Sequence, residues 1–314
     1  MIEVLQHLKG RSFTRINDWS HDELRDLLDL ADELKGLHAR REPHALLPGR
    51  TVGLLFELPS TRTRVSFAVA AEHLGAGAIA LDVEHTQLAR GESVAETAAS
   101  LSRYLDALVY RTRRQEDLDE LAATATIPVL NGLTEKTNPC QTLADLMTIR
   151  ERCGRLSGVR LAYVGDGNNV CRSLMRGAAK FGMRFIAATP PDCTPAQDAI
   201  DLTRKAAIQQ GGTVEFTDDP RQAVEHAEVL YTSEWVGVGP EDGRERGVAA
   251  LQGFGIDDDL LALADPGAFV MHCLPARPGE EITSELLYGP RSAVWDQVEN
   301  RLHVHKALLA LVMR

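Results

Sequence analysis

Short apolar runs alternate with amphipathic stretches along almost the whole chain. The apolar runs have the length of strands, and the stretches between them repeat their apolar positions at helical spacing. This alternation predicts βαβ units, in which parallel strands are covered by helices. The runs form two series, and we expect strands within residues 51–57, 78–83, 107–112 and 127–132 of the first series and 159–167, 184–190, 213–218, 228–233 and 267–275 of the second.

Helix signals separate the expected strands. Ser20 and Glu23 have the spacing of a capping box, and apolar residues at helical spacing follow them. Further helices are expected to begin near Thr61, Ser93 and Asp117, each between two apolar runs. The chain therefore has the strand–helix rhythm of a parallel sheet.

Two longer helical stretches set the domain organisation. Residues 141–154 separate the two series of strands and predict one connecting helix, and residues 293–314 predict a last helix that returns to the first domain. The expected fold class is α/β, with two doubly wound parallel-sheet domains. We expect one domain over residues 1–140 with 293–314, and the other over 141–292. In such sheets, ligands bind beyond the carboxyl ends of the strands.

Composition narrows the functional classes. A chain of 314 residues suits two domains, and 44% hydrophobic with 25% charged residues is ordinary for a globular protein. The formal net charge is 34 − 45 = −11, which argues against a general surface for nucleic acid or anionic membrane. No uninterrupted apolar stretch is long enough to predict a membrane span, and the N-terminus does not predict a secretory signal.

The cysteines point to a reducing compartment. Their number is odd and no C-x-x-C pair occurs, so we expect reduced thiols in the cytoplasm and no zinc site. The five residues are Cys140, Cys153, Cys171, Cys193 and Cys273.

The stretch from residue 60 to residue 64 concentrates donors for an anion. Ser60, Thr61 and Thr63 would place hydroxyl and backbone N–H groups at the start of a helix, where the helix dipole favours a phosphate. Arg62 and Arg64 add positive charge, although alternate residues diverge on a helix and one of the two is expected to face the anion. A capped helix with solvated arginines is the other interpretation. The position after a strand favours a phosphate site.

Six segments together carry a family resemblance. They are STRTRVSF (60–67), TQLARGES (86–93), YRT (110–112), NPCQTLAD (138–145), HCLPA (272–276) and ENRLH (299–303). In this order they resemble the motifs of the aspartate and ornithine carbamoyltransferase superfamily, and the last two segments match the ornithine branch. The similarity covers nearly the whole chain.

The resemblance implies an enzyme that moves the carbamoyl group of carbamoyl phosphate to an amine and releases phosphate. The domain over residues 1–140 and 293–314 would bind carbamoyl phosphate, and the domain over 141–292 would bind the acceptor, which is ornithine by default and gives citrulline. The residues implied to hold carbamoyl phosphate are Ser60, Thr61, Arg62, Thr63, Gln87, Arg111, Asn138, Gln141, Cys273, Leu274 and Arg301. Of these, Arg62, Arg111, Gln141, Cys273 and Arg301 are implied to be catalytic.

The resemblance also implies the acceptor site and the assembly. Asn169, Ser233, Gly237 and Val238 occupy the acceptor positions, and Gln87 would reach the site of a neighbouring subunit, which implies a homotrimer with shared active sites. No cofactor and no metal are expected. The GDGNN segment (165–169) lacks the G-x-G-x-x-G spacing of a dinucleotide loop.

Six positions depart from the family pattern, and two of them, Gly237 and Val238, stand where a serine–methionine pair is usual. Leu58 stands where a lysine is usual, Ala68 where a glutamate is usual, and Asn138 where a histidine is usual. On the acceptor side, Ser233 replaces an aspartate that grips an α-amino group. Asn138 can still donate a neutral hydrogen bond, but a charge-assisted bond is stronger by about 1 kcal/mol or more.

These departures leave alternatives open. The same chemistry could act on a diamine, a modified ornithine or another amino acid of specialised metabolism, or on a hydroxyl group. A further alternative is a protein that binds carbamoyl phosphate without transferring its carbamoyl group. Product analysis with a panel of amines distinguishes these cases.

Overall fold

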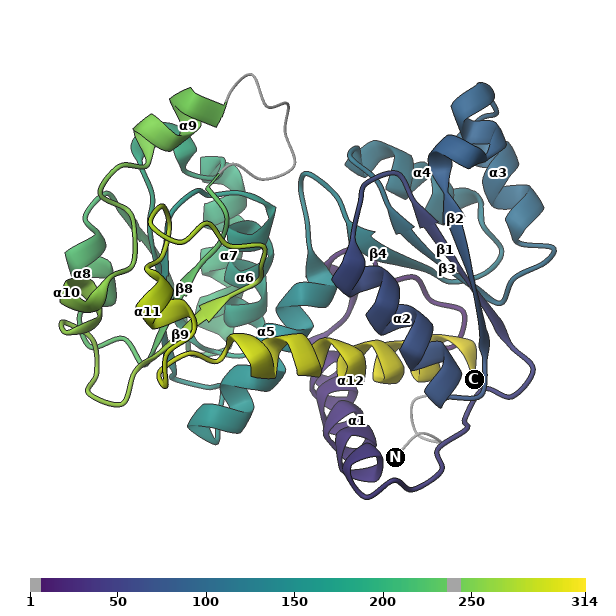
Figure 1. Cartoon of the computed structure of the whole chain (residues 1–314), viewed down its shortest axis with the longest axis horizontal. Helices are drawn as coiled ribbons and strands as arrows, with labels where there is room; N and C mark the ends of the chain where they lie inside the picture. Colours follow the sequence, from purple (N-terminus) through teal and green to yellow (C-terminus); the bar gives the residue numbers. More distant parts are fainter. Residues whose placement is uncertain (1–6, 236–243) are drawn as a thin grey trace. The chain divides into compact units, whose positions relative to one another are not determined.

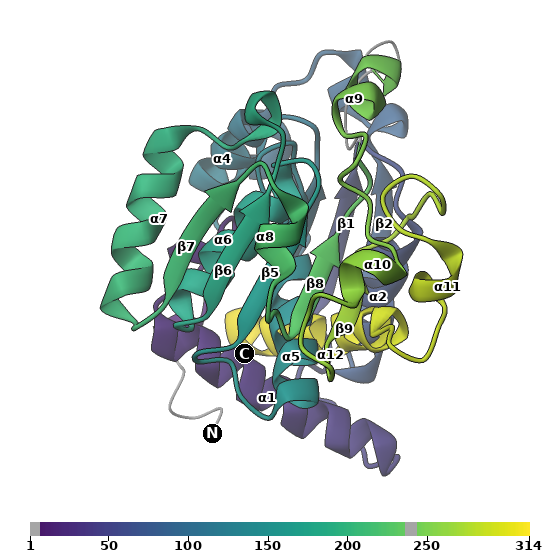
Figure 2. The ribbon, with the colours of Figure 1, turned by 90° about the vertical axis from the view of Figure 1, so that its left-hand side faces the viewer.

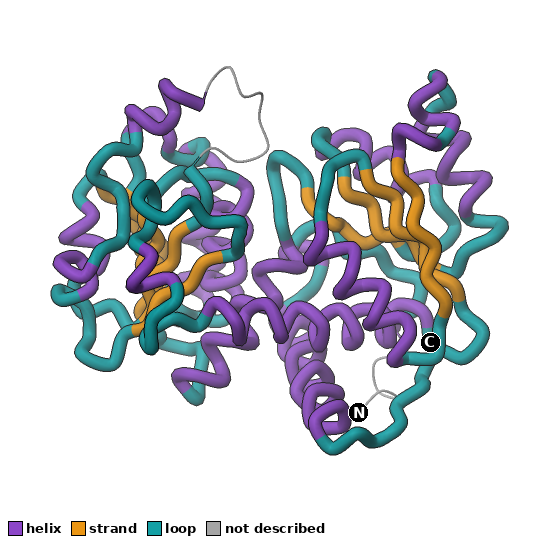
Figure 3. Tube along the Cα trace, in the orientation of Figure 1, coloured by secondary structure: helices purple, strands orange, loops and turns teal. Residues whose placement is uncertain are grey.

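The computed structural model describes residues 7–235 and 244–314. The chain forms two compact units, one made of Met1–Ala144 with Glu299–Arg314 and the other of Asp145–Val298. Figure 3 shows the strands gathered into two separate sheets with helices around each. The α/β class that the alternating pattern predicts is confirmed.

The first unit contains a parallel sheet of four strands in the order β2-β1-β3-β4. The strands are β1 (Thr51–Phe56), β2 (Gly77–Asp82), β3 (Ala107–Arg111) and β4 (Val129–Leu133). The helices of this unit are α1 (His21–Ala39), α2 (Thr61–His73), α3 (Val94–Leu101) and α4 (Gln115–Thr124), with short 3-10 turns η2 (Ile16–Asp18), η3 (Val83–His85) and η4 (Gln87–Arg90). Figure 1 shows α2 in front of this sheet and α4 behind it.

Most side chains on both faces of β1, β3 and β4 are buried, whereas those of β2 are largely exposed. Leu55 and Leu108 pack with Leu118 and Leu121 of α4 on one face. On α2, Phe67 is completely buried. Because parallel strands covered on both faces need apolar residues at successive positions, β1 and β3 read as nearly continuous apolar runs.

Serine caps set where the helices of the first unit begin. The Ser20 hydroxyl accepts a hydrogen bond from the backbone N–H of Glu23, and the Glu23 carboxylate accepts one from the backbone N–H of Ser20, so the predicted capping box is confirmed. Ser93 and Glu96 form a second capping box at α3. These caps satisfy N–H groups that a helix start leaves without partners.

The second unit contains a parallel sheet of five strands in the order β7-β6-β5-β8-β9. The strands are β5 (Arg160–Val164), β6 (Arg184–Ala188), β7 (Thr213–Thr217), β8 (Val229–Thr232) and β9 (Phe269–His272). The helices are α6 (Asn169–Lys180), α7 (Gln197–Gln209), α8 (Pro220–Val224), α9 (Arg244–Ala250), α10 (Asp258–Leu261) and α11 (Ser284–Leu287), with the 3-10 turn η5 (Pro191–Cys193). Figure 2 faces this unit, with β7, β6 and β5 side by side.

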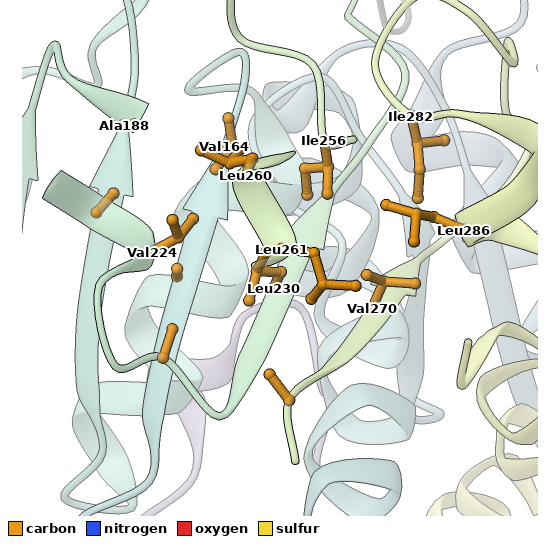
Figure 4. Close-up of a cluster of buried hydrophobic side chains, with 14 of the residues drawn as sticks. Val164, Ala188, Val224, Leu230, Ile256, Leu260, Leu261, Val270, Ile282 and Leu286 are labelled. Carbon is orange, nitrogen blue, oxygen red and sulfur yellow. The ribbon is translucent and has the colours of Figure 1, made fainter. Parts of the chain in front are cut away.

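One apolar core lies on a face of the second sheet. Val164, Leu230 and Val270 of three neighbouring strands pack with Leu260 of α10 and Leu286 of α11 (Figure 4). This core packs the neighbouring strands β5, β8 and β9 together. The predicted acceptor residues Asn169 and Ser233 follow β5 and β8, and the predicted carbamoyl-phosphate residues Cys273 and Leu274 follow β9.

Two long helices contribute to both units. Helix α5 (Pro139–Cys153) is the connecting helix predicted between the two series of strands, and α12 (Val294–Met313) is the predicted last helix. In the first unit, Lys35 of α1 donates to Asn300 of α12 over 2.8 Å, and the His305 ring stacks on Phe67 with centroids 3.7 Å apart. The prediction that the last helix returns to the first domain is confirmed.

The predicted strands are confirmed, with shifts at some ends. The run predicted over residues 267–275 stops at His272 because Leu274 adopts a left-handed backbone with φ of 54°, which a strand cannot contain. The helix predicted near Asp117 begins earlier, at Gln115.

Candidate functional site

The start of α2 carries the predicted anion-binding stretch. Ser60 is the N-cap, and its hydroxyl accepts a hydrogen bond from the backbone N–H of Thr63 over 3.3 Å. Thr61 is exposed and Arg62 is half-buried. The N–H groups in the first turn of a helix have no acceptor within the helix, and the helix dipole makes this end favourable for an anion.

Arg301 of α12 joins the start of α2 to α5. Its guanidinium donates from Nη2 to the Thr63 hydroxyl over 2.5 Å and from Nη1 to the side-chain oxygen of Gln141. All three side chains are buried. Thr63 keeps its own O–H proton and Gln141 keeps its amide N–H groups, so both remain donors. The structure therefore brings together three predicted site residues that are far apart in the sequence.

Arg111 ends β3 beside two other arginines. Its Nη1 donates to the backbone oxygen of Gly132 over 3.2 Å, while its buried Nε has no hydrogen-bond partner among the described residues. Burial, reinforced by the positive charges of Arg301 and Arg62, lowers the pKa of the Arg111 guanidinium to about 10. Three guanidiniums gathered in this way repel one another, and a bound anion would relieve that repulsion.

Two other predicted donor-site residues lie in the first unit. Asn138 is buried immediately before α5, and its backbone oxygen accepts from the N–H of Thr142 over 3.3 Å. Gln87 is exposed in the first position of η4.

The charge of Arg64 is already paired with a carboxylate, so it is not left over for an anion at the start of α2. Arg64 pairs with Asp82, and its guanidinium lies 5.1 Å from the centre of the Phe56 ring. A pocket of about 510 Å³ borders this pair and is lined also by Leu58 and Pro59. Of the two arginines in the stretch, Arg62 is therefore the one that remains for an anion at the helix start, as the helical spacing predicts.

Two of the predicted acceptor residues, Asn169 and Ser233, lie at the start of α6. Asn168 is the N-cap, because its side-chain oxygen accepts from the N–H groups of Val170 and Cys171. Asn169 is the first residue of the helix and is buried. Asn169 was predicted from the sequence as an acceptor residue and Asn168 was not, although a capping asparagine is expected at the residue before a helix.

Ser233 is buried in a hydrogen-bond network. Its hydroxyl lies 2.8 Å from the Tyr163 hydroxyl and accepts from the Asn168 amide over 3.0 Å. The Tyr163 hydroxyl donates its proton to the backbone oxygen of Asp166 over 2.8 Å, so the Ser233 hydroxyl donates to Tyr163. Ser233 thus keeps one lone pair as an acceptor and carries no charge. Tyr163 and Asn168 are site residues that the sequence analysis did not identify.

Cys273 and Leu274 follow β9. Both are half-buried, and Leu274 has the left-handed backbone already described. Gly237 and Val238, which were predicted to contact the acceptor, lie outside the described residues. Nearby, Trp235 is buried, and its indole N–H has no hydrogen-bond partner within the described part of the chain.

Burial also changes a carboxyl group of the GDGNN segment. The pKa of Asp166 is raised to about 6 by burial, which the charge of Arg172 opposes. Within residues 7–235 and 244–314, no group of three or more His, Cys, Asp or Glu side chains is arranged to hold a metal ion. In the same residues, no helix is both long and apolar enough to cross a membrane.

Comparisons with known proteins match nearly the whole chain to one family. Residues 11–151 match the carbamoyl-phosphate-binding domain of aspartate/ornithine carbamoyltransferases, and residues 157–312 match their aspartate/ornithine-binding domain. The chain is 47% identical over 309 residues to the ornithine carbamoyltransferase of Symbiobacterium thermophilum, covering 98% of this chain and 99% of the relative. It is 44% identical over 306 residues to the anabolic ornithine carbamoyltransferase of Pyrococcus furiosus, covering 98% and 97% of the two chains.

Solved structures show the same similarity. The ornithine carbamoyltransferase structure from Pyrococcus furiosus aligns with a TM-score of 0.94 at 44% identity and covers 98% of each chain. That from Gloeobacter violaceus aligns with a TM-score of 0.87 at 42% identity, covering 98% of this chain and 99% of the other.

Proposed function

This chain belongs to the aspartate/ornithine carbamoyltransferase family, and we propose that it transfers the carbamoyl group of carbamoyl phosphate to ornithine, giving citrulline and phosphate. The observation that carries the proposal is the arginine cluster of the first unit. Arg62, Arg111 and Arg301 lie close enough that the charges of the other two lower the pKa of Arg111. A dianionic donor such as carbamoyl phosphate is the kind of ligand that this cluster and the start of α2 would attract.

The proposed donor site divides into two parts. Ser60, Thr61, Arg62, Thr63 and Arg111 would hold the phosphate, through hydroxyl, guanidinium and backbone N–H donors. The carbamoyl group would lie near Asn138, Gln141, Cys273, Leu274 and Arg301, with Gln87 supplied by a neighbouring subunit.

The proposed chemistry uses these donors to stabilise developing charge. The neutral amine attacks the carbonyl carbon, a C–N bond forms, and the C–O bond to phosphate breaks with its electron pair leaving on phosphate. In the net reaction, the proton that the attacking nitrogen loses ends on the released phosphate, which leaves as HPO₄²⁻. Charge develops on the carbonyl oxygen and on the departing phosphate, so fixed donors such as Arg62, Arg111, Gln141 and Arg301 lower the barrier. Cys273 would lie beside the attacking amine.

We propose that the second unit binds the acceptor. Asn169, Ser233, Gly237 and Val238 hold the positions that contact the amino acid in the family pattern. The corresponding domains would be residues 1–140 with 293–314 for carbamoyl phosphate and residues 141–292 for the acceptor. No cofactor or metal takes part in this scheme.

The proposed assembly is a homotrimer in the cytoplasm, with shared active sites. Strand β2 supports an assembly because it is the edge of its sheet and exposes apolar residues, among them Ile79 at 48%. An exposed apolar edge strand is a surface that proteins usually cover. Val65 on α2 is 54% exposed as well. A measured mass of three chains would support the trimer. All five cysteines are free, as expected for a reducing compartment.

The direct test is product analysis. Purified protein would receive carbamoyl phosphate with ornithine, and in parallel with diamines, modified ornithines and hydroxyl compounds, while phosphate release and product mass are followed. Citrulline formation that falls more than tenfold in Arg62→Ala supports the proposal. Arg113→Ala is the control, since Arg113 is an exposed arginine outside the cluster. Turnover confined to another acceptor, or carbamoyl-phosphate binding without turnover, would refute ornithine transfer.

A further inference from the structure

One carboxylate oxygen closes the loop that carries Cys273. The loop runs from His272, the last residue of β9, to Arg277. The Oε1 atom of Glu281 accepts from the backbone N–H of Arg277 over 2.6 Å and lies 3.2 Å from Nε2 of His272. The same oxygen therefore holds both ends of the loop.

The other nitrogen of the His272 ring holds the middle of the loop. Its Nδ1 accepts a hydrogen bond from the backbone N–H of Leu274 over 2.9 Å. An accepting Nδ1 carries no proton, so the proton of the neutral ring is on Nε2 and is donated to Glu281. The hydrogen bond also restrains Leu274, whose left-handed φ of 54° is unfavourable in a residue other than glycine.

His272 and Glu281 are polar side chains that are completely buried, which apolar packing does not explain. The side chains of His272 and Glu281 are both 0% exposed, and Oε2 of Glu281 has no hydrogen-bond partner among the described residues. Replacing such buried polar pairs by well-packed apolar residues is often neutral or stabilising. The stability of the core therefore does not explain why a carboxylate is buried here. The hydrogen bonds that Glu281 accepts from the two ends of the loop do explain it.

The strand end before the loop is fixed from a second side. Gln297 accepts from the backbone N–H of His272 over 2.9 Å, and its amide donates to Asp145 over 2.9 Å. The other carboxylate oxygen of Asp145 accepts from the Tyr231 hydroxyl over 3.1 Å. These contacts hold the backbone of His272 in place, so its ring is a rigid support for Leu274.

We propose that His272 and Glu281 are positioning residues for carbamoyl transfer, acting as a neutral imidazole and a carboxylate that hold the Cys273–Leu274 turn in its working conformation. This inference rests on the proposed function of the turn. The pair touches neither substrate in this account and acts only through the backbone of the loop. The positioning role predicts that a hydrogen-bond acceptor at residue 272 matters more than the imidazole ring itself.

Four variants separate this role from packing. In His272→Asn, the side-chain oxygen can still accept from the N–H two residues later, whereas His272→Leu removes every polar contact. Glu281→Gln keeps an acceptor for Arg277 and for the ring. Leu286→Ala is the matched control, because it removes buried apolar atoms from the core against which Leu274 and Ala276 also pack, and leaves the hydrogen bonds of the loop in place.

The first readout is independent of turnover. The rate of alkylation of the half-buried Cys273 is measured by peptide mass analysis, with Cys153 as an internal reference. His272→Leu should raise the rate at Cys273 at least fivefold relative to Cys153, while His272→Asn, Glu281→Gln and Leu286→Ala stay within twofold of the wild type. Equal rates in wild type and a folded His272→Leu would overturn the inference whether or not the protein transfers carbamoyl groups.

The second readout is the kinetics of citrulline formation. His272→Leu should lower kcat at least tenfold while inhibition by inorganic phosphate changes less than twofold, because the phosphate-binding residues lie on the first unit. His272→Asn and Glu281→Gln should each keep most of the wild-type kcat. If His272→Leu does not fold, Glu281→Gln decides the matter, since a tenfold loss in that folded variant would mean that the charge itself acts and would overturn the positioning role. An inactive wild-type protein would refute the proposed function, and the alkylation rates would still decide the role of the pair.

Discussion

Lys306 lies in the same helix as Arg301 and offers a quantitative test of the packing of α12. Its side chain is 0% exposed, and its ammonium group donates to the backbone oxygen of Leu34 over 3.2 Å and lies 3.3 Å from Nε2 of His44. Burial lowers the pKa of Lys306 from 10.5 to about 8. The charged form is therefore destabilised in the folded protein.

The magnitude follows from the shift in the pKa. A difference of about 2.5 units corresponds to about 3 kcal/mol. We expect Lys306→Met to be more stable than the wild type at about pH 7, by roughly 2 kcal/mol after subtraction of about 1 kcal/mol for the lost hydrogen bond to Leu34.

The pH dependence has a definite sign. Between about pH 8 and about pH 10.5 the unfolded chain binds a proton at Lys306 that the folded chain does not, so the stability of the wild type rises with pH. The advantage of Lys306→Met should consequently shrink by about 2–3 kcal/mol between about pH 7 and about pH 10. The charge of Lys306 also lowers the pKa of His303, but that histidine is neutral above about pH 7, so it adds little to the difference between the two proteins over this range.

The assay is urea unfolding of both proteins at the two pH values, from which the free energies of unfolding are obtained. A difference between wild type and Lys306→Met that stays the same at both pH values would contradict the reasoning. A wild type that is more stable than Lys306→Met at neutral pH would also contradict it.

Other changes test the packing and the networks. Burial and the charge of Lys306 lower the pKa of His303 to about 3, so the folded protein should lose about 1.4 kcal/mol per pH unit below about pH 6.5, a slope that His303→Leu should remove in urea titrations. Gly167→Ala would place its methyl carbon 2.2 Å from the backbone oxygen of Cys193 and should lower the stability by roughly 1–3 kcal/mol. Gly36→Ala, within α1, should raise the stability by roughly 0.5–1 kcal/mol. Thermal scans of the two glycine variants measure these effects as changes in Tm, and equal Tm changes in Gly167→Ala and Gly36→Ala would contradict both expectations. Ser233→Ala should cost roughly 1–3 kcal/mol in urea unfolding by leaving buried polar groups short of a partner, and an unchanged free energy would contradict the network.

Local patterns predicted the elements because their causes are local. The capping serines satisfy N–H groups only a few residues away, so Ser20 and Ser60 could be recognised from the sequence. The strands follow from short apolar runs, because a parallel sheet buries both of its faces. The end of β9 at His272 was predicted too late, since the left-handed backbone of Leu274 leaves no signal in an apolar segment.

Contacts between distant residues needed more than local patterns. Arg301 meets Thr63 across 238 positions of the sequence, and only the family resemblance placed both in one site. The partners of Ser233 and the pairing of His272 with Glu281 were not predicted at all, because hydrogen bonds of this kind depend on which strand ends lie side by side in the sheet. The three arginines of the cluster were each predicted from the sequence. The lowered pKa of Arg111 was not, because it depends on burial and on the nearby charges of Arg301 and Arg62 in the folded chain.

The most direct test of the central claim compares Arg111→Ala with Arg113→Ala. The measured quantity is kcat/KM for carbamoyl phosphate at saturating ornithine, with citrulline identified by mass. The proposed site predicts citrulline formation by the wild type, a decrease of roughly tenfold to a hundredfold in Arg111→Ala from the loss of a charge-assisted bond, and a change below twofold in Arg113→Ala. No citrulline from the wild type, or an undiminished kcat/KM in Arg111→Ala, would contradict it.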